Sequence, residues 1–319
     1  MADKRPGLLK DIGWRLEALA FDVVSAFLRL WPTDLVSAFG GFLVGTIGPL
    51  TSEQRTVDRN LRLAFPDMPP DKRLEIARAA WRNIGRTFAE LPLMHRLSEG
   101  NGRIVVAGRE HLEEAIARRI PTIFFSGHIS NYEVMALVVV QAGIQGFLAY
   151  RPTNNPYFDR RIVESRRRYG VKLFAAKGRG FAREVLNTLA RGDSLGIMVD
   201  QKFSFGVQVP FFGHAAPTDP APIRLALTAN ARIQPMSVER LKGARYRMTF
   251  YEPYYLDRTG DRDADVFAGT ARITKFMEDR ARENPEEYFW MHRRWADSVY
   301  RELAEKEAAE AHQGSATPR

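Results

Sequence analysis

From residue 103 onward, short apolar runs rich in β-branched and aromatic residues alternate with stretches whose apolar residues recur at helical spacing. The short runs predict strands, and the longer stretches predict helices. Strands and helices in regular alternation are typical of a parallel sheet with helices on its faces. We therefore predict an α/β fold with a mostly parallel central sheet of about seven strands, flanked by helices. The predicted strands are residues 104–106, 122–125, 146–150, 171–174, 195–199, 233–238 and 246–251, and the predicted helices are residues 110–118, 130–141, 156–169, 180–191 and 221–229.

Before residue 103 the pattern is helical, and part of it is strongly apolar. Residues 16–30 contain few charged positions, and residues 35–50 contain none. This second stretch is shorter than the roughly 20 residues that a perpendicular bilayer span requires. Two interpretations remain open: two helices that lie in or dip into a membrane interface, or two core helices of a soluble subdomain.

Residues 51–97 predict amphipathic helices, for which we expect Phe65, Trp81, Ile84 and Phe88 to be core anchors.

At the other end of the chain, residues 267–282 and 285–305 predict two final helices. The tail beyond Glu307 lacks the apolar content to fold, so we expect it to be disordered. The predicted organisation is a membrane-associated helical segment over residues 1–102, an α/β domain over residues 103–300, and a helix end with a disordered tail over residues 301–319.

The composition narrows the chemistry. The chain has 319 residues, a net charge of +9 and no cysteine, which excludes a thiol nucleophile, a disulfide framework and a thiolate metal site. The positive charge indicates anionic partners, such as a membrane surface, a phosphorylated substrate, an acidic protein or a nucleic acid. The N-terminus shows no uninterrupted apolar run with a small-residue cleavage site, so no secretory signal is predicted.

Residues 126–133, with the sequence Ser-Gly-His-Ile-Ser-Asn-Tyr-Glu, join a predicted strand to a predicted helix. A histidine can take a proton from a hydroxyl at neutral pH, and a nearby carboxylate can fix its tautomer. His128 and Glu133 supply these two groups if His128 lies in the turn and Glu133 in the first turn of the helix. The structural alternative is a capping box, in which Ser130 and Glu133 only begin the helix.

Polar residues also follow other predicted strands, and the carboxyl ends of parallel strands meet at one edge of a sheet. A base, several cations and an acid at that edge suggest a reaction on an anionic substrate. No complete dinucleotide, phosphate-loop, calcium-loop, zinc-helix or nucleophile-elbow motif occurs, so neither a metal nor covalent serine chemistry is expected. The polar segments at this edge are Tyr150-Arg151-Pro152-Thr153-Asn154-Asn155-Pro156, Lys177-Gly178-Arg179-Gly180 and Asp200-Gln201-Lys202.

Segments in order along most of the chain carry a family resemblance. They are residues 60–66 (Asn-Leu-Arg-Leu-Ala-Phe-Pro), residues 81–86, His128 with Glu133, residues 150–152 followed by Asn155, Asp159 and Arg166, residues 200–201, residues 209–213 (Val-Pro-Phe-Phe-Gly) and residues 285–295. Together they resemble the late acyltransferases of lipid A biosynthesis, of the lauroyl and myristoyl type, within the lysophospholipid acyltransferase superfamily. Residues 219–222, Asp-Pro-Ala-Pro, depart from the glycine-containing turn that is more usual there.

The resemblance implies transfer of an acyl chain from acyl carrier protein to a hydroxyl of a lipid A precursor, at the cytoplasmic face of the inner membrane. No cofactor is expected, because the acyl carrier protein is a co-substrate. In this scheme His128 is the general base, Glu133 orients it, and the hydroxyl attacks the thioester without an acyl-enzyme. The residues expected to bind substrate are Asn131, Arg151, Asn155, Arg166 and Asp200, with the two arginines on phosphate.

Two alternatives remain. One is an acyltransferase of the same superfamily that acts on another membrane glycolipid or phospholipid. The other is a basic membrane-surface or nucleic-acid-binding protein without enzymatic activity; we expect no nucleic-acid partner, because the cations are spread along the chain apart from one dense group at residues 160–168.

Overall fold

A seven-stranded sheet lies at the centre of the protein, with the strand order β1-β9-β8-β2-β5-β3-β4. The computed structural model describes residues 7–150, 152–175 and 180–315. Neighbouring strands run parallel except for β8 and β9. The predicted fold class is confirmed, and each predicted strand corresponds to a strand of this sheet. The strands are β1 (Ile104–Ala107), β2 (Thr122–Ser126), β3 (Gly146–Tyr150), β4 (Leu173–Ala175), β5 (Ser194–Met198), β8 (Arg232–Arg240) and β9 (Tyr246–Phe250).

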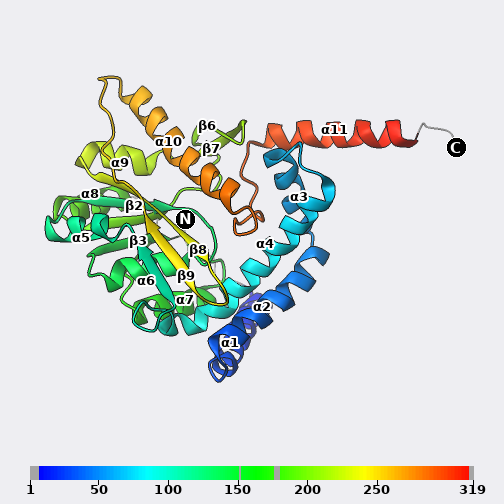
Figure 1. Ribbon diagram of the computed structural model, residues 1–319, viewed down its shortest axis with the longest axis horizontal. Helices are drawn as coiled ribbons and strands as arrows, with labels where there is room; N and C mark the ends of the chain where they lie inside the picture. The colour runs from blue at the N-terminus through cyan, green and yellow to red at the C-terminus, as the bar shows by residue number, and fades with distance from the viewer. Residues whose placement is uncertain (1–6, 151, 176–179, 316–319) are drawn as a thin grey trace.

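Helices cover both faces of the sheet (Figure 1). Central strand β2 is buried throughout, and its side chains alternate between two hydrophobic clusters because successive residues of a strand point to opposite faces. Phe124 packs with α5 and α6 on one face, whereas Ile123 and Phe125 pack with α8, α9 and α10 on the other. These helices are α5 (Arg109–Ala117), α6 (Glu133–Gln141), α7 (Pro156–Arg168), α8 (Phe181–Ala190), α9 (Ala221–Ala229) and α10 (Arg262–Glu283).

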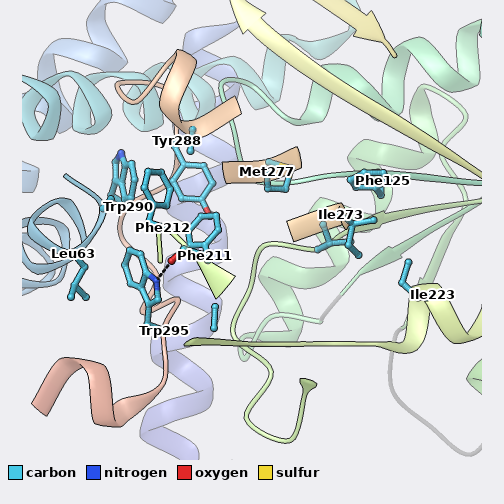
Figure 2. Close-up of a cluster of buried hydrophobic side chains, with 14 of the residues drawn as sticks. Leu63, Phe125, Phe211, Phe212, Ile223, Ile273, Met277, Tyr288, Trp290 and Trp295 are labelled. Carbon is cyan, nitrogen blue, oxygen red and sulfur yellow. Dashed lines mark hydrogen bonds between the residues drawn. The ribbon is translucent and has the colours of Figure 1, made fainter. Parts of the chain in front are cut away.

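A β-hairpin that the pattern did not predict, β6 (Val207–Phe211) and β7 (His214–Thr218), covers part of the core. The segment between α10 and α11 (Asp297–Ser315) packs against it, and Figure 2 shows Trp290 beside Phe212 and Trp295 beside Phe211. The Trp295 Nε1–H donates to the Phe211 carbonyl at 2.7 Å.

The predicted helix over residues 285–305 is therefore wrong in its first half, since α11 begins at Asp297. Tyr288 and Trp290 are both buried with ring centroids 4.8 Å apart, and residues two positions apart share a side in an extended chain but not in a helix. The helix also continues to Ser315, past the point at which disorder was expected.

Helices α1 (Leu8–Leu28) and α2 (Thr33–Ile47) lie along the edge of the molecule (Figure 1). Their large apolar side chains point outward, which is not the burial pattern of core helices. Within the described residues, the segment Thr33–Leu50 meets the length and composition for a membrane span, a test that core helices and signal sequences also pass. The exposed apolar residues of this edge are Leu8, Leu9, Ile12, Leu16, Leu19, Val23, Val24, Phe27, Leu30, Trp31, Leu35, Phe39, Phe42, Leu43, Ile47 and Leu50.

Helices α3 (Glu53–Ala64) and α4 (Pro70–Glu90) belong to the same hydrophobic core as the sheet. The expected anchors Trp81 and Ile84 are buried, and Phe65 packs against the core. Phe88 is not an anchor, since it is 49% exposed. Beyond Ile84 the buried side of α4 shifts to its polar residues Thr87 and Glu90.

Candidate active site

The parallel pairing of β2 with β5 brings two functional side chains together. In the register of this pair, Ser126 lies opposite Met198. His128 and Asp200 each follow two residues later, at the carboxyl end of the sheet where α/β proteins bind ligands. Two residues that are far apart in the sequence therefore become neighbours.

Asp200 binds the turn through both carboxylate oxygens. Its Oδ1 lies 2.8 Å from His128 Nδ1, and its Oδ2 accepts the backbone N–H of His128 at 2.7 Å. A Cβ on Gly127 would lie 2.8 Å from the Asp200 carboxyl carbon, so only glycine allows this approach without a shift. With Nδ1–H donating to Asp200, the Nε2 of His128 is left as the proton acceptor.

Both groups are buried, with the His128 side chain 15% exposed and that of Asp200 4% exposed. Burial by itself lowers the pKa of His128, but the charge and hydrogen bond of Asp200, and then the charge of Glu133, outweigh it and raise the pKa above its ordinary value. Burial raises the pKa of Asp200, and its interactions with His128 lower it below the ordinary value overall. The two groups therefore form a mutually stabilised ion pair when His128 is protonated.

The turn at residues 126–133 has a strained backbone at Ser130, and hydrogen bonds from other parts of the chain hold it in place. Ser130 has a positive φ of 51°, which a residue other than glycine adopts at a cost of about 1–3 kcal/mol. Its N–H donates to the Glu287 carbonyl at 2.9 Å, and its carbonyl accepts from Thr87 Oγ1 at 3.1 Å. The capping box expected of Ser130 and Glu133 does not form, because Asn131 Oδ1 accepts the N–H of Glu133 instead. The turn is positioned by α4 and by the segment before α11.

Glu133 forms a bidentate ion pair with Arg166 of α7. Arg166 Nε donates to Oε2 at 3.0 Å and Nη2 donates to Oε1 at 2.5 Å. The two side chains are 5% and 15% exposed. The carboxylate bonded to the His128 imidazole is thus Asp200, whereas Glu133 acts on that imidazole only through its charge.

The remaining residues expected to bind substrate are held by protein groups. Asn131 is fully buried and donates to Glu90 Oε2 at 2.7 Å, within a network that includes the Arg240–Glu90 ion pair. Asn155 accepts the first N–H groups of α7 through Oδ1, and its Nδ2 donates to the Trp14 carbonyl of α1 at 3.0 Å. In the structure both asparagines thus support the scaffold. Arg151 and residues 177–179 lie outside the described residues.

An apolar pocket of about 480 Å³ begins at His128 and runs between α6 and strands β3 and β5. Its volume lies within the range of small-molecule sites. Glu133 and Arg166 are part of its wall, and Gln201 and Lys202 add polar groups. Most of the wall is apolar and includes Val139, Val140, Ile144, Leu148, Ile197, Met198 and Met236. A lipid-like chain fits this surface better than a polar metabolite.

A second histidine lies beside the first, and the sequence pattern did not single it out. The His292 ring centroid is 5.7 Å from that of His128 and 4.4 Å from that of Phe289. Loss of hydration, followed by the charge of His128, lowers the pKa of His292 to about 4, so this imidazole is neutral at pH 7. The signal for His292 in the sequence was its position within residues 285–295, one of the segments that carry the family resemblance.

Comparison with known proteins identifies the family. The profile of the bacterial lipid A biosynthesis acyltransferases matches residues 17–297, which span most of the chain. The chain belongs to the bacterial lipid A biosynthesis acyltransferase family. It is therefore an acyltransferase of lipid A biosynthesis, as the sequence resemblance implied.

Three relatives that are named for lipid A biosynthesis share only about a quarter of the aligned residues with this chain. A lipid A biosynthesis acyltransferase of Haemophilus influenzae is 25% identical over 246 residues, which cover 74% of this chain and 75% of the relative. A lipid A biosynthesis lauroyltransferase of Escherichia coli is 24% identical, covering 76% and 78% of the two chains. A lipid A biosynthesis palmitoleoyltransferase of the same organism is 24% identical, covering 82% and 85%. Different acyl chains occur in these names, so membership in the lipid A acyltransferase family does not assign a chain length.

Proposed function

We propose that this lipid A acyltransferase moves a fatty acyl chain from acyl carrier protein to a hydroxyl of a lipid A precursor, with His128 as the general base. The observation that carries the proposal is the His128 imidazole, bonded to Asp200 at the mouth of an apolar pocket. A base beside an apolar chain site is what transfer of an acyl group to a hydroxyl requires.

The chemical step follows from this geometry. His128 Nε2 takes the proton of the acceptor hydroxyl while its oxygen attacks the thioester carbonyl carbon. The carbon–sulfur bond then breaks, and the proton on Nε2 passes to the departing thiolate. Asp200 stabilises the imidazolium between the two transfers, as the aspartate of a catalytic triad does. The oxygen–carbon bond replaces the carbon–sulfur bond directly, so no acyl-enzyme is formed.

The pocket is the proposed site of the acyl chain. It extends along β3 (Gly146–Tyr150), and five residues of strand cover roughly 16 Å. Burial of apolar surface contributes about 25 cal/mol per Å², so a chain that fills such a pocket gains substantial binding energy. The Glu133–Arg166 pair at its wall is the proposed neighbour of the polar thioester end. Arg166 is already paired with Glu133, so a substrate phosphate would have to compete with that carboxylate for the guanidinium group.

Membrane attachment through α1 and α2 is the second part of the proposal, at the cytoplasmic face of the inner membrane. Helix α1 turns its polar side toward the protein: Tyr157 of α7 donates to Asp11 at 2.8 Å, and Arg161 of α7 pairs with Asp22. Its apolar side faces outward, the reverse of a helix that packs on a soluble core. An interfacial membrane helix has this arrangement.

The test of the base is His128→Ala. We expect it to lower the rate of acyl transfer by about 10²–10⁴-fold, the usual contribution of a general base. The assay is mass spectrometry of a lipid A precursor after incubation with acyl carrier protein that bears a thioester-linked chain. His111→Ala, on α5 outside the site, is the matched control. A wild-type rate for His128→Ala would rule out the assignment, and equal rates with acyl-coenzyme A would remove the carrier protein as the specific donor.

A further inference from the structure

The glycines of α2 face α4 in two different ways. The two helices run side by side (Figure 1). A Cβ on Gly40 would lie 2.6 Å from the Gly85 carbonyl oxygen, so this glycine lets the two backbones approach. Helix pairs with small residues at the contact commonly pack this closely.

Gly41 and Gly45 instead make room for charged side chains. A Cβ on Gly41 would lie 2.9 Å from Cγ of Arg86, and a Cβ on Gly45 would lie 2.5 Å from Cγ of Arg82. These contacts involve the base of each arginine side chain, which cannot move aside as easily as its tip. The aliphatic stems of both arginines therefore lie across α2, and their positions depend on the two glycines.

Within the described part of the chain, the arginines on this side of α4 have no acidic partner. Arg78, Arg82 and Arg86 follow one another at intervals of four residues, so they share one side of the helix. Among the residues that the structure describes, no carboxylate lies within ion-pair distance of these three. Like charges at this spacing weaken a helix. Several other exposed cations of the protein pair with a carboxylate three or four residues away, as in Lys72–Glu75 near the start of α4, Arg118–Glu114, Lys275–Asp279 and Arg282–Glu278.

The unpaired arginines border the apolar surface of the molecule. Phe39 and Phe42 of α2 are 53% and 70% exposed, on the side of α2 that faces away from α4. In a helix that lies at a membrane interface, cations beside the apolar face reach the level of the lipid phosphates. A guanidinium group binds phosphate through two parallel hydrogen bonds.

We propose that Arg78, Arg82 and Arg86 form a binding row for the phosphate groups of anionic phospholipids. The proposal rests on the membrane attachment argued above and names the lipid class that this attachment selects. An acidic protein surface would also suit the charge, but the row lies directly beside α2, a helix whose outward side is apolar. The position therefore favours a lipid leaflet.

The test compares two double variants with the same loss of charge. Arg82→Gln/Arg86→Gln removes two members of the row, and Arg183→Gln/Arg224→Gln removes two exposed arginines of α8 and α9, at the other side of the molecule in Figure 1. Co-sedimentation is measured with vesicles of phosphatidylglycerol and phosphatidylcholine, and with vesicles of phosphatidylcholine alone. A third variant, Arg82→Lys/Arg86→Lys, keeps the charge and checks that the α2–α4 contact survives.

On the anionic vesicles we expect the first variant to bind about 30-fold more weakly, since each basic residue at such a surface contributes about a fivefold factor at low salt. The difference should shrink at 0.5 M salt, and binding to the neutral vesicles should not change. The control should stay within about threefold of wild type, and the lysine variant should keep most of the affinity.

Three results would overturn the proposal. One is an equal loss of the first variant on both kinds of vesicle, which would indicate a packing defect. Another is unchanged binding of the first variant to both kinds of vesicle. A lower affinity of the same variant for acyl carrier protein would then indicate that the row binds a protein. The last is wild-type protein that binds neither vesicle, which would also reject the membrane attachment. None of these readouts depends on acyl transfer, so a failure of the enzymatic proposal is recognised separately.

Discussion

Two carboxylates are buried beside the same turn, and they bond to different groups. Asp200, at the end of β5, bonds to the ring and backbone nitrogens of His128, whereas Glu133, at the start of α6, forms a bidentate pair with Arg166. The pairing with Asp200 raises the pKa of the imidazole in the first pair above its ordinary value, and this group exchanges a proton, while the guanidinium of the second pair stays charged. The comparison separates two roles: the Asp200 pair suits proton transfer, and the Glu133 pair suits a fixed arrangement of charge at the pocket wall.

Asp200→Asn should have the largest effect. The amide keeps the size of the side chain but no longer fixes the productive tautomer of His128, a change that costs about 10⁴-fold in the serine protease triad. We expect kcat to fall by about 10²–10⁴-fold. The acid limb of the kcat/KM profile should also move to lower pH, because the charge that raises the pKa of His128 is gone.

The measurement is a pH profile of acyl transfer with the purified variant. Asp279→Asn, an exposed position of α10, is the matched control for loss of one carboxylate. An acid limb that stays at the wild-type pH would show that Asp200 does not set the protonation of His128.

Glu133→Gln should act mainly on stability. It leaves the Arg166 guanidinium largely buried without its charge partner, and removal of one member of a buried ion pair costs about 3–5 kcal/mol. We expect a loss of about 3 kcal/mol in the free energy of unfolding, measured by urea denaturation. The expected loss lies at the lower end of this range, because the glutamine side chain can still accept one hydrogen bond from Arg166.

Replacement of both partners sharpens the same comparison. Glu133→Met/Arg166→Met should recover most of the stability, since apolar replacement of a buried ion pair is often neutral. If the double variant is as stable as wild type but inactive, the pair serves the reaction. Full activity in the stable double variant would make the pair purely structural, and it would contradict a substrate-side role for Arg166.

Much of the fold could be predicted from local pattern. Strand β2 is a continuous apolar run because both of its faces are buried, and the helices on either side show the usual spacing. The segment 285–296 could not be predicted in this way, because its aromatic residues also fit a helical stripe. Its true path depends on tertiary contacts such as the bridge between Ile129 and Tyr288.

The active site also depends on contacts between distant parts of the chain, which the local sequence pattern does not predict. The motif places His128 and Glu133 close in the sequence, so the sequence favoured them as hydrogen-bond partners. Asp200 reaches His128 only because Ser126 pairs with Met198, and strand order and register are not readable from one sequence. Arg166 reaches Glu133 from α7 for the same kind of reason, since the docking of that helix depends on distant contacts.

The smallest expected effect is the pH dependence of stability. The folded pKa of His128 lies above its unfolded value of about 6.5, so its pairing with Asp200 stabilises the native state fully below that pH and is lost as the pH rises through the folded pKa. Each unit of pKa difference corresponds to about 1.4 kcal/mol. Between pH 6 and 9, the free energy of unfolding of the wild type should therefore fall more steeply than that of Asp200→Asn, measured by urea denaturation at each pH. Glu133→Gln should keep more of the wild-type slope than Asp200→Asn, because the charge of Glu133 contributes less than Asp200 to the raised pKa of His128 and Arg166 does not titrate in this range. An equally flattened slope in both variants would mean that the two carboxylates contribute equally to the pKa of His128.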